Sequence, residues 1–286
     1  MNVIEVENLS KTFRVRQKEK GMYGSLKSII RPQTKEIKAV ENISFTVQEG
    51  EMLAFIGPNG AGKSTTIKML TGILYPDSGR MDVLGIDPIK KRKQLAYLIG
   101  TVFGQKEQLW THLTPYDNFR FFGAIYDIPD RESESRIQEL TDIFDLGSII
   151  NTPVRNLSLG QRMRCEIVAS LIHKPKVLFL DEPTIGLDPV VKENIRSLIK
   201  EMNQEFDTTI FLTSHDIGDI EKLCRRIIII NDGRIVRDES MEHLKLDNVR
   251  HHAEAEYIEN DGTSDISLED IIIDIYKTEG SAESNL

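Results

Sequence analysis

The segment Gly57–Ser64, with the sequence GPNGAGKS, constrains the fold more than any other part of the chain. It follows the apolar run EMLAFI and opens the stretch STTIKMLTGIL, whose apolar spacing predicts a helix. A glycine-rich turn between a strand and a helix directs backbone N–H groups, and the positive end of the helix, at an anion. Because Lys63 and Ser64 complete the pattern, it predicts a phosphate-binding loop rather than a structural turn. Lys63 can reach β- and γ-phosphates, and the Ser64 hydroxyl can ligate Mg²⁺.

A second chemical signal is the run KVLFLDEP, residues 176–183. It predicts a buried strand that ends in Asp181 and Glu182, at the edge of a parallel sheet where ligands of α/β proteins bind. Asp181 can hold Mg²⁺ through water, and Glu182 can act as general base toward an attacking water. A solvated strand end is the alternative, which the phosphate-binding loop in the same chain disfavours.

The rest of the chain alternates between strand and helix patterns. NVIEVENL and ISFTVQEG predict short strands, TTIFLTSHD a buried strand, and RRIIIINDGRIV a strand pair that turns at Asp232–Gly233. Helical spacing follows Thr114, which can cap a helix with Pro115 in its first turn, and continues in RESESRIQELTDIFDL. The alternation predicts an α/β fold with a mostly parallel sheet and a helical insertion from about residue 107 to 170.

Composition excludes several classes of protein. The chain is 40% apolar and 28% charged, which is not the balance of a disordered, collagen-like or coiled-coil chain. No apolar run approaches the roughly 20 residues of a membrane-spanning helix, and the first residues lack the pattern of a signal peptide. Two cysteines, Cys165 and Cys224, cannot form a disulfide framework, so we expect an intracellular globular protein.

The net charge of −9 is unevenly distributed. Residues 239–286 hold thirteen acidic and three basic side chains, whereas residues 14–38 hold eight basic and two acidic ones. Such asymmetry is typical of contact with an anionic membrane or nucleic acid, and solvated charge on a loop and a tail is the alternative.

Further motifs occur in a fixed order. After the phosphate-binding loop come Gln105, the sequence LSLGQ at 157–161, Gly186-Leu187-Asp188 and Ser214-His215, while Phe13 precedes the loop. Taken together, residues 1 to about 240 resemble the ATP-binding subunit of ABC transporters. LSLGQ stands where the family has LSGGQ, so Leu159 replaces the first glycine.

The resemblance implies a P-loop NTPase (ABC ATPase) core in residues 1–240, with a mostly parallel sheet, an N-terminal antiparallel β part and a helical subdomain carrying the LSLGQ motif. It also implies roles for individual residues. Catalysis would fall to Lys63, Gln105, Glu182 and His215, and Mg²⁺ would be held by Ser64, Gln105 and Asp181. ATP would be bound by Phe13, Gly57, Pro58, Asn59, Gly60, Ala61, Gly62, Lys63, Ser64 and Thr65, and across a dimer interface by Ser158, Gly160, Gln161 and Asp188.

The partners that the resemblance implies are transmembrane permease subunits and a second copy, or a homologous ATPase subunit, at the cytoplasmic side of the cell membrane, with no nucleic acid. SLGQRMRCEI and VFGQKEQLW resemble the ABC-2-type exporter branch, so we expect export, with an importer subunit as the alternative. A soluble ABC ATPase is less favoured. ABC ATPases that act on ribosomes usually carry two cassettes in one chain, whereas this chain has one phosphate-binding loop. Those that act on chromosomes insert long coiled-coil arms between the two halves of the site, and the 118 residues from Lys63 to Asp181 contain no heptad run.

Three segments extend beyond a minimal cassette. Residues 14–38 form a basic insertion in which Met22 to Arg31 predict an amphipathic helix at a membrane surface, with a surface hairpin as the equal alternative. Trp110 is expected either in the core or, slightly favoured, in a groove that receives the permease. The acidic tail 241–286 contains ISLEDIIIDIYK, which can form a short amphipathic helix but is too short for an independent domain.

Overall fold

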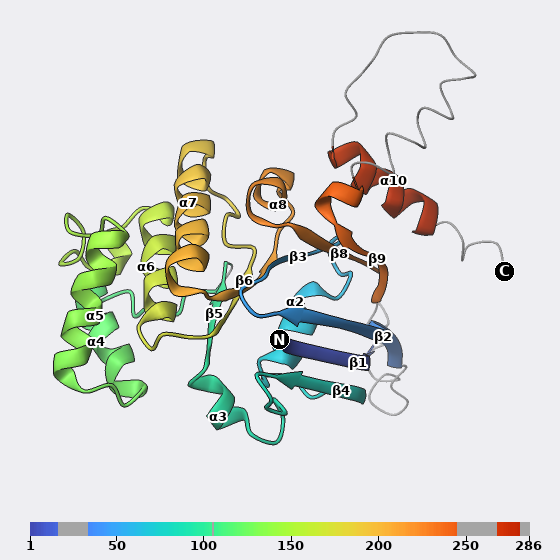
Figure 1. Cartoon of the computed structure of the whole chain (residues 1–286), viewed down its shortest axis with the longest axis horizontal. Coiled ribbons are helices and arrows are strands. Elements are labelled where there is room, and N and C mark those ends of the chain that lie inside the picture. The colour runs from blue at the N-terminus through green and yellow to red at the C-terminus, as the bar shows by residue number, and fades with distance from the viewer. Residues whose placement is uncertain (17–33, 105, 245–267, 281–286) are drawn as a thin grey trace, which may run out of the picture.

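The computed structural model describes residues 1–16, 34–104, 106–244 and 268–280 (Figure 1). The helix expected within 22–31 lies outside these residues, and so does Gln105. Among the described residues, no helix combines the length and apolarity needed to cross a bilayer.

A six-stranded sheet forms the centre, in the order β5-β6-β7-β3-β8-β9. All neighbouring pairs are parallel except β8 and β9, which form the expected hairpin at Asp232–Gly233. The strands span Ile99–Phe103 (β5), Val177–Asp181 (β6), Thr209–Thr213 (β7), Met52–Ile56 (β3), Arg226–Asn231 (β8) and Arg234–Ser240 (β9).

Both faces of this sheet are covered, which explains the continuous apolar runs of its strands. Along β3, Leu53 and Phe55 join the core on one face, while Ala54 and Ile56 join the core on the other. Phe55 packs against Phe45 and Phe211, with ring centroids 5.7 and 5.2 Å apart. The alternation follows from the two-residue repeat of a strand.

A second, antiparallel sheet covers one face in the order β2-β1-β4, which confirms the N-terminal antiparallel part. β1 spans Asn2–Arg16, β2 spans Thr34–Gln48 and β4 spans Ser78–Val83. β1 and β2 are longer than the short strands expected from the sequence. The described ends of the basic insertion are strands, with Arg14 opposite Glu36 and Arg16 opposite Thr34.

The helical insertion contains α4 (Pro115–Ile125), α5 (Asp130–Ile143), a 3₁₀ turn at Val154–Asn156 and α6 (Leu159–Leu171). α4 begins as predicted, because the Thr114 side chain accepts a hydrogen bond from the Asp117 N–H and Pro115 follows it. These helices gather at one end of the molecule, beyond β5 and β6 (Figure 1).

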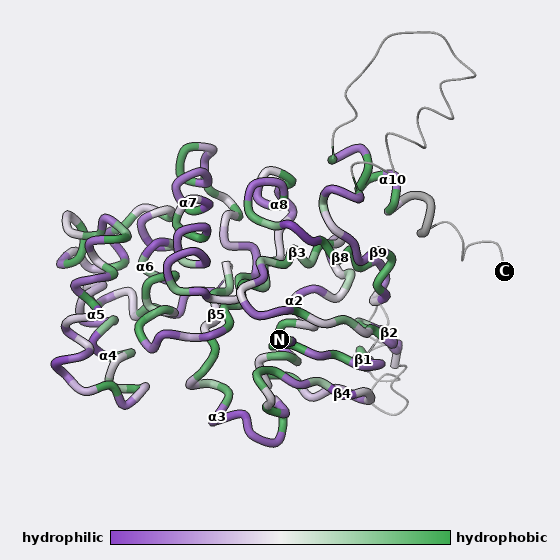
Figure 2. Tube along the Cα trace, viewed as in Figure 1, coloured by the Kyte–Doolittle hydropathy of each residue, from purple (hydrophilic) through white to green (hydrophobic). Residues whose placement is uncertain are grey.

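The remaining helices connect the strands of the core. They are α2 (Lys63–Leu70), α3 (Arg92–Ala96), α7 (Pro189–Phe206) and α8 (Ile217–Leu223). α7 buries Ile195, Ile199 and Met202, which lie on one face at helical spacing. Figure 2 accordingly shows hydrophilic and hydrophobic residues alternating along the turns of the helix.

The tail contains the helix α10 (Leu268–Gly280), at the end of the molecule opposite α4 and α5 (Figure 1). Leu268, Ile271, Ile272 and Ile275 are buried in the core that also contains residues of β8. The predicted amphipathic helix therefore exists, and it packs on the cassette rather than standing apart from it.

Candidate nucleotide-binding and catalytic site

The phosphate-binding loop joins β3 to α2, as predicted, and its shape requires glycine at two positions. Gly62 has φ +112°, and a Cβ atom there would lie 2.3 Å from the Ala39 carbonyl oxygen. At Gly57 a Cβ atom would lie 2.1 Å from the Ile230 carbonyl oxygen. Any side chain at these positions would push the loop away from β2 or β8 and change its curvature.

Lys63 is the first residue of α2, and its side chain folds back over the loop. Nζ donates hydrogen bonds to the carbonyl oxygens of Gly57 at 2.7 Å and Pro58 at 3.2 Å. Burial lowers the pKa of Lys63, while the carboxylates of Glu182 and Asp181 oppose that shift. The cation is thus held inside the loop, where a phosphate could replace the carbonyl contacts.

Ser64 and Asp181 meet beside this lysine, together with a residue that sequence reasoning missed. Ser64 Oγ donates to Asp181 Oδ1 at 3.1 Å, and Thr213 Oγ1 donates to the same oxygen at 2.7 Å. Thr213 ends β7 directly opposite Asp181 in the parallel register. Its place at the end of a neighbouring buried strand was the signal that could have identified it.

A hydroxyl next to a single carboxylate fits Mg²⁺, which keeps several waters and binds through one or two protein oxygens plus phosphates. Ser64 and Asp181 could supply those two oxygens, and the third expected ligand, Gln105, lies outside the described residues. Within the described ranges, no group of three or more His, Cys, Asp or Glu residues could hold a metal ion by itself.

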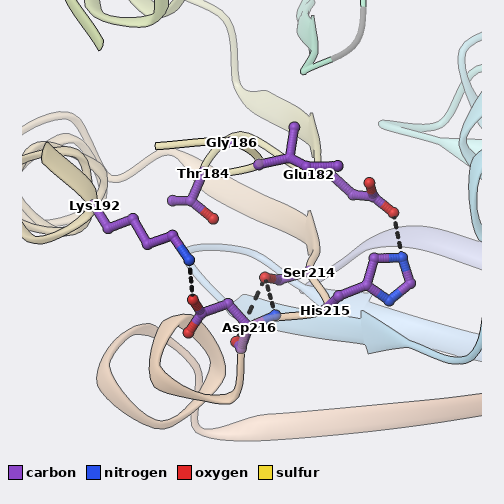
Figure 3. Close-up of a pocket in the computed structure, with 8 residues that line it drawn as sticks. Glu182, Thr184, Gly186, Lys192, Ser214, His215 and Asp216 are labelled. Carbon is purple, nitrogen blue, oxygen red and sulfur yellow. Dashed lines mark hydrogen bonds and ion pairs between the residues drawn. The ribbon is translucent and has the colours of Figure 1, made fainter. Parts of the chain in front are cut away.

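Glu182 and His215 form a close pair on the same sheet edge, shown in Figure 3. Glu182 Oε1 lies 2.6 Å from His215 Nε2, and Lys63 Nζ lies 3.3 Å from the same nitrogen. The pair borders a cavity of about 210 Å³. The base and the histidine expected from sequence are therefore brought together with the loop lysine.

The backbone of Glu182 is unusual, because its φ of +57° lies in the left-handed region. Its N–H donates to the Thr213 carbonyl at 3.0 Å, which holds it against β7. On the other side lies Gly104, where a Cβ atom would be 2.2 Å from the Glu182 carbonyl oxygen. Strain of this kind persists where the surroundings over-determine it, often at functional sites. Gly104, which directly precedes Gln105 in the sequence, thus lies against the backbone of Glu182.

The LSLGQ motif forms the start of α6. Ser158 caps the helix, because its Oγ accepts from the Gln161 N–H at 3.3 Å while Gln161 Oε1 accepts from the Ser158 N–H at 2.9 Å. Leu159 is the first helical residue and is 48% exposed. A helical first position needs no glycine, so the leucine does not disturb this backbone.

Gly160 and Asp188, two residues expected to contact ATP from a partner, have structural tasks within their own chain. Gly160 is buried, and a Cβ atom there would lie 2.3 Å from Val191 Cγ1 of α7. Asp188 caps α7 by accepting from the N–H groups of Val190 and Val191, both at 3.1 Å. Ser158 and Leu159 are the exposed residues of the motif's first helical turn.

Phe13 lies on β1, is 37% exposed and has the Lys11 ammonium 5.8 Å from its ring centroid. It lines a pocket with Lys11, Leu74 and Asp77 to which the phosphate-binding loop contributes no residue. The stacking of Phe13 on adenine stays a prediction.

Glu166 of α6 is a buried residue that the sequence analysis did not select. Its Oε1 accepts from the N–H groups of Gln108 at 2.9 Å and Leu109 at 3.2 Å, while Oε2 is buried and has no hydrogen-bond partner among the described residues. Burial raises the pKa of this carboxyl. Glu166 thereby ties the segment after Gln105 to the helix that begins at Ser158. The position of this acidic residue between Cys165 and Ile167, within the predicted helical insertion, was the available signal.

Trp110 is 45% exposed, so the core position that the sequence also allowed is wrong. Its ring meets Phe121 edge to face, with centroids 4.2 Å apart. Its backbone is held by the fully buried Asn118, whose Oδ1 accepts from the Trp110 N–H at 2.8 Å. An exposed aromatic pair thus sits on a rigid support.

A phosphate loop, a hydroxyl–carboxylate pair and a glutamate beside a histidine, on one edge of a parallel sheet, define a P-loop nucleoside triphosphatase. The family model described as ABC transporter matches residues 40–185. The chain therefore belongs to the ABC transporter family, as an ATP-hydrolysing transporter subunit, and the predicted family and fold class are confirmed.

Several curated relatives are similar over most of the chain. It is 33% identical to the ABC transporter ATP-binding protein NatA of Bacillus subtilis over 73% of this chain and 85% of that protein. It is 34% identical to the bacitracin transport ATP-binding protein BcrA of Bacillus licheniformis over 79% of this chain and 69% of that protein. It spans only 24% of the longer ABC transporter A family member 1 of Dictyostelium discoideum.

Solved structures share the fold. One is a dimeric, post-hydrolysis state of the ATP-binding cassette MJ0796 bound to ADP and Pi, with 27% identity, a TM-score of 0.68, and coverage of 83% of this chain and 98% of that one. Another is cbiO1 from Clostridium perfringens, part of the ABC transporter complex cbiONQ, with 27% identity, a TM-score of 0.71, and coverage of 90% and 95%.

Proposed function

We propose that this subunit binds ATP with Mg²⁺, closes with a second ATPase subunit and drives a membrane permease in the direction of export. The observation that carries the proposal is the Glu182–His215 pair, 2.6 Å apart, beside the buried Lys63. A carboxylate in that position serves a hydrolase, whereas a nucleotide-binding regulator would need only the loop.

In this proposal the chain's own groups share the work. The loop N–H groups and Lys63 bind the phosphates, and Ser64 and Asp181 hold Mg²⁺, which when bound would neutralise charge on the phosphate oxygens. Glu182 accepts the proton of the attacking water. His215, within hydrogen-bond distance of Glu182, orients that carboxylate and the terminal phosphate.

The second subunit completes the site. Exposed Ser158, at the start of α6, would present its hydroxyl and the positive end of the helix to the γ-phosphate bound by the partner's loop. Because the phosphate would join two surfaces, ATP would favour the dimer over the separate subunits. The dimeric MJ0796 cassette supports this arrangement.

The permease would bind the helical insertion. Apolar side chains that are between 39% and 48% exposed lie on this part of the chain, namely Trp110, Leu113, Phe121 and Ile125. Trp110 and Phe121 contact each other and offer a continuous apolar surface. Such a surface suits a short helix of a membrane subunit, which would place this protein at the cytoplasmic face of the membrane.

Export is the preferred direction, since the sequence resembles the exporter branch. The membrane contact proposed for residues 14–38 rests on their charge. An importer subunit is the second candidate.

The experiment is to purify the chain with the permease encoded beside its gene and to reconstitute both in vesicles. ATP-driven movement of cargo away from the side that carries this subunit would support export. Movement toward that side, or dependence on an external binding protein, would support the importer instead. Absence of ATP hydrolysis with any permease would refute the proposal as a whole.

A further inference from the structure

We propose that Asp219 is a positioning residue that fixes the distance between Glu182 and His215. This inference rests on the proposed ATP hydrolysis. Asp219 lies on α8, outside the motifs that the sequence analysis selected, and its side chain is fully buried. It contacts neither of the two catalytic residues and would act through the segments that carry them.

The Asp219 carboxylate joins these two segments directly. Its Oδ2 accepts from Thr184 Oγ1 at 2.5 Å and from Ser214 Oγ at 2.6 Å. Thr184 is two residues after Glu182, and Ser214 immediately precedes His215. One oxygen atom, Asp219 Oδ2, therefore links the segment that follows Glu182 to the residue that precedes His215.

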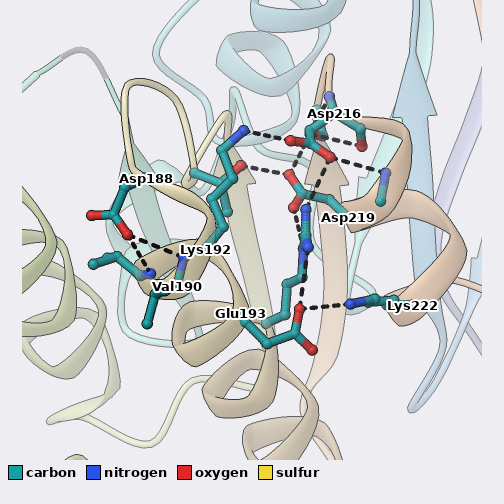
Figure 4. Close-up of polar contacts among 12 residues, drawn as sticks. Asp188, Val190, Lys192, Glu193, Asp216, Asp219 and Lys222 are labelled. Atoms are coloured by element: carbon teal, nitrogen blue, oxygen red, sulfur yellow. Dashed lines mark hydrogen bonds and ion pairs between the residues drawn. The ribbon is translucent and has the colours of Figure 1, made fainter.

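The other carboxylate oxygen binds a third element. Arg196 of α7 donates from Nε to Asp219 Oδ1 at 2.6 Å and from Nη2 to Asp216 Oδ1 at 2.9 Å. Lys192, one turn earlier on α7, pairs with Asp216 at 2.5 Å (Figure 4). α7 begins just after Asp188, so the network also holds the element that follows the Gly186-Leu187-Asp188 motif.

Burial explains why this arrangement has one stable geometry. A buried carboxylate is costly unless it is fully hydrogen-bonded and paired with a cation, as Asp219 is here. Separation of the Thr184 segment from the Ser214 segment would break a hydrogen bond to a charged acceptor. The Glu182–His215 distance is thus fixed by hydrogen bonds from Thr184 and Ser214, two residues that line the same cavity, to the buried Asp219 carboxylate.

The first test replaces Asp219 with Asn, which keeps the size but removes the charge and half the acceptor capacity. We expect kcat for ATP to fall roughly 10- to 100-fold, the range that corresponds to loss of one such hydrogen bond. The Kd of ATP for the isolated subunit should stay within about twofold, since Lys63 and the loop are untouched. Glu193→Gln is the matched control, because exposed Glu193 pairs with Arg196 and Lys222 at the edge of the same network.

The second test distinguishes positioning from general loss of structure. In a His215→Ala background the pair no longer exists, so adding Asp219→Asn should lower kcat by less than about twofold. A purely structural role predicts that the two losses multiply. If Asp219→Asn does not fold, Thr184→Val replaces it in this test. Thr184→Val removes a single hydrogen bond to Asp219 Oδ2, and its loss of kcat should likewise be non-additive with that of His215→Ala.

The outcomes separate this inference from the function on which it rests. A wild-type protein without ATPase activity would refute both. An active wild type, together with an Asp219→Asn variant that keeps wild-type kcat or loses activity multiplicatively with His215→Ala, would refute the positioning role alone. Folding failure of Asp219→Asn with multiplicative loss in Thr184→Val would do the same.

Discussion

Ser64 and Asp181 are 117 residues apart in the chain, yet Ser64 Oγ donates a hydrogen bond to Asp181 Oδ1 at 3.1 Å. The contact joins the start of α2 to the end of β6 and sets the two oxygen atoms that we propose as Mg²⁺ ligands side by side. Thr213 supports the same carboxylate oxygen from β7.

This contact leads to a prediction about magnesium. Asp181→Asn should raise the Mg²⁺ concentration needed for half-maximal ATPase activity by about 10- to 100-fold, the usual effect of losing a metal's supporting group. A Mg²⁺ titration at saturating ATP measures it. An unchanged midpoint would mean that Asp181 does not take part in holding the ion.

The general base is tested by Glu182→Gln, which preserves size and removes proton acceptance. ATP should still bind, whereas hydrolysis should fall about 10²–10⁴-fold. Single-turnover phosphate release and equilibrium ATP binding measure the two quantities separately. Hydrolysis at the wild-type rate would show that Glu182 is not the base.

The split site is tested by Ser158→Arg, which places a large cation at the exposed start of α6. Monomeric ATP binding should persist, while ATP-driven dimerisation and hydrolysis are lost. Mixing this variant with Lys63→Ala chains should restore at most one competent site per heterodimer. Thr114→Arg, which removes the cap of α4 instead, is the control for lost capping. Loss of monomeric ATP binding in Ser158→Arg would contradict the arrangement.

A pH-dependence follows from His173, whose ring stacks on Tyr126 and whose Nε2 lies 2.9 Å from the Ile99 carbonyl oxygen. Burial lowers the pKa of His173 from 6.5 to about 4. As pH falls from 6.5 toward 4, the unfolded chain takes up a proton that the folded one does not. The free energy of unfolding should therefore decrease through this range, by up to about 3 kcal/mol from this group. Denaturant titrations of wild type and His173→Phe at pH 7 and pH 4.5 should show a smaller decrease in the variant.

The basic insertion is tested by replacing Lys20, Lys27 and Arg31, all outside the described residues, with Glu. If they meet anionic lipid, each contributes about 1 kcal/mol near the membrane surface. Transport and permease association in anionic membranes should then decline, while the ATPase activity of the isolated subunit and its melting temperature stay constant. Normal transport by a stable variant would remove the membrane contact from the proposal.

The phosphate-binding loop, the β8–β9 turn and the start of α4 could be predicted because each depends on local chemistry. Gly57–Ser64, Asp232–Gly233 and Thr114–Pro115 are short patterns whose backbone demands are contained in their own residues. The sheet edge that carries Asp181 and Glu182 was also predictable, since a buried apolar strand must end where polar residues begin.

Other features depend on neighbours distant in sequence. The sequence motif indicates that Gly160 contacts a phosphate. The structure gives a second reason for glycine at this position, because Val191 of α7 leaves no space for a side chain. In the sequence Asp219 is one more acidic residue on a polar helix, and only the fold brings Thr184, Ser214 and Arg196 into contact with it. The β1–β2 pairing extends to Arg16 opposite Thr34, although the apolar residues Phe13, Val15 and Ile37 on this extension are exposed rather than buried in a core.

The packing of α10 sets a practical limit on where this protein can be shortened. A chain ending at Ser240, the boundary suggested by motif positions, would keep every nucleotide-binding residue. It would lose the aliphatic side chains of Leu268, Ile271, Ile272 and Ile275, each contributing about 1.5–3 kcal/mol by burial. The apolar surface that these side chains cover would become exposed to solvent. Such a fragment should therefore aggregate during expression, although it retains the nucleotide-binding residues.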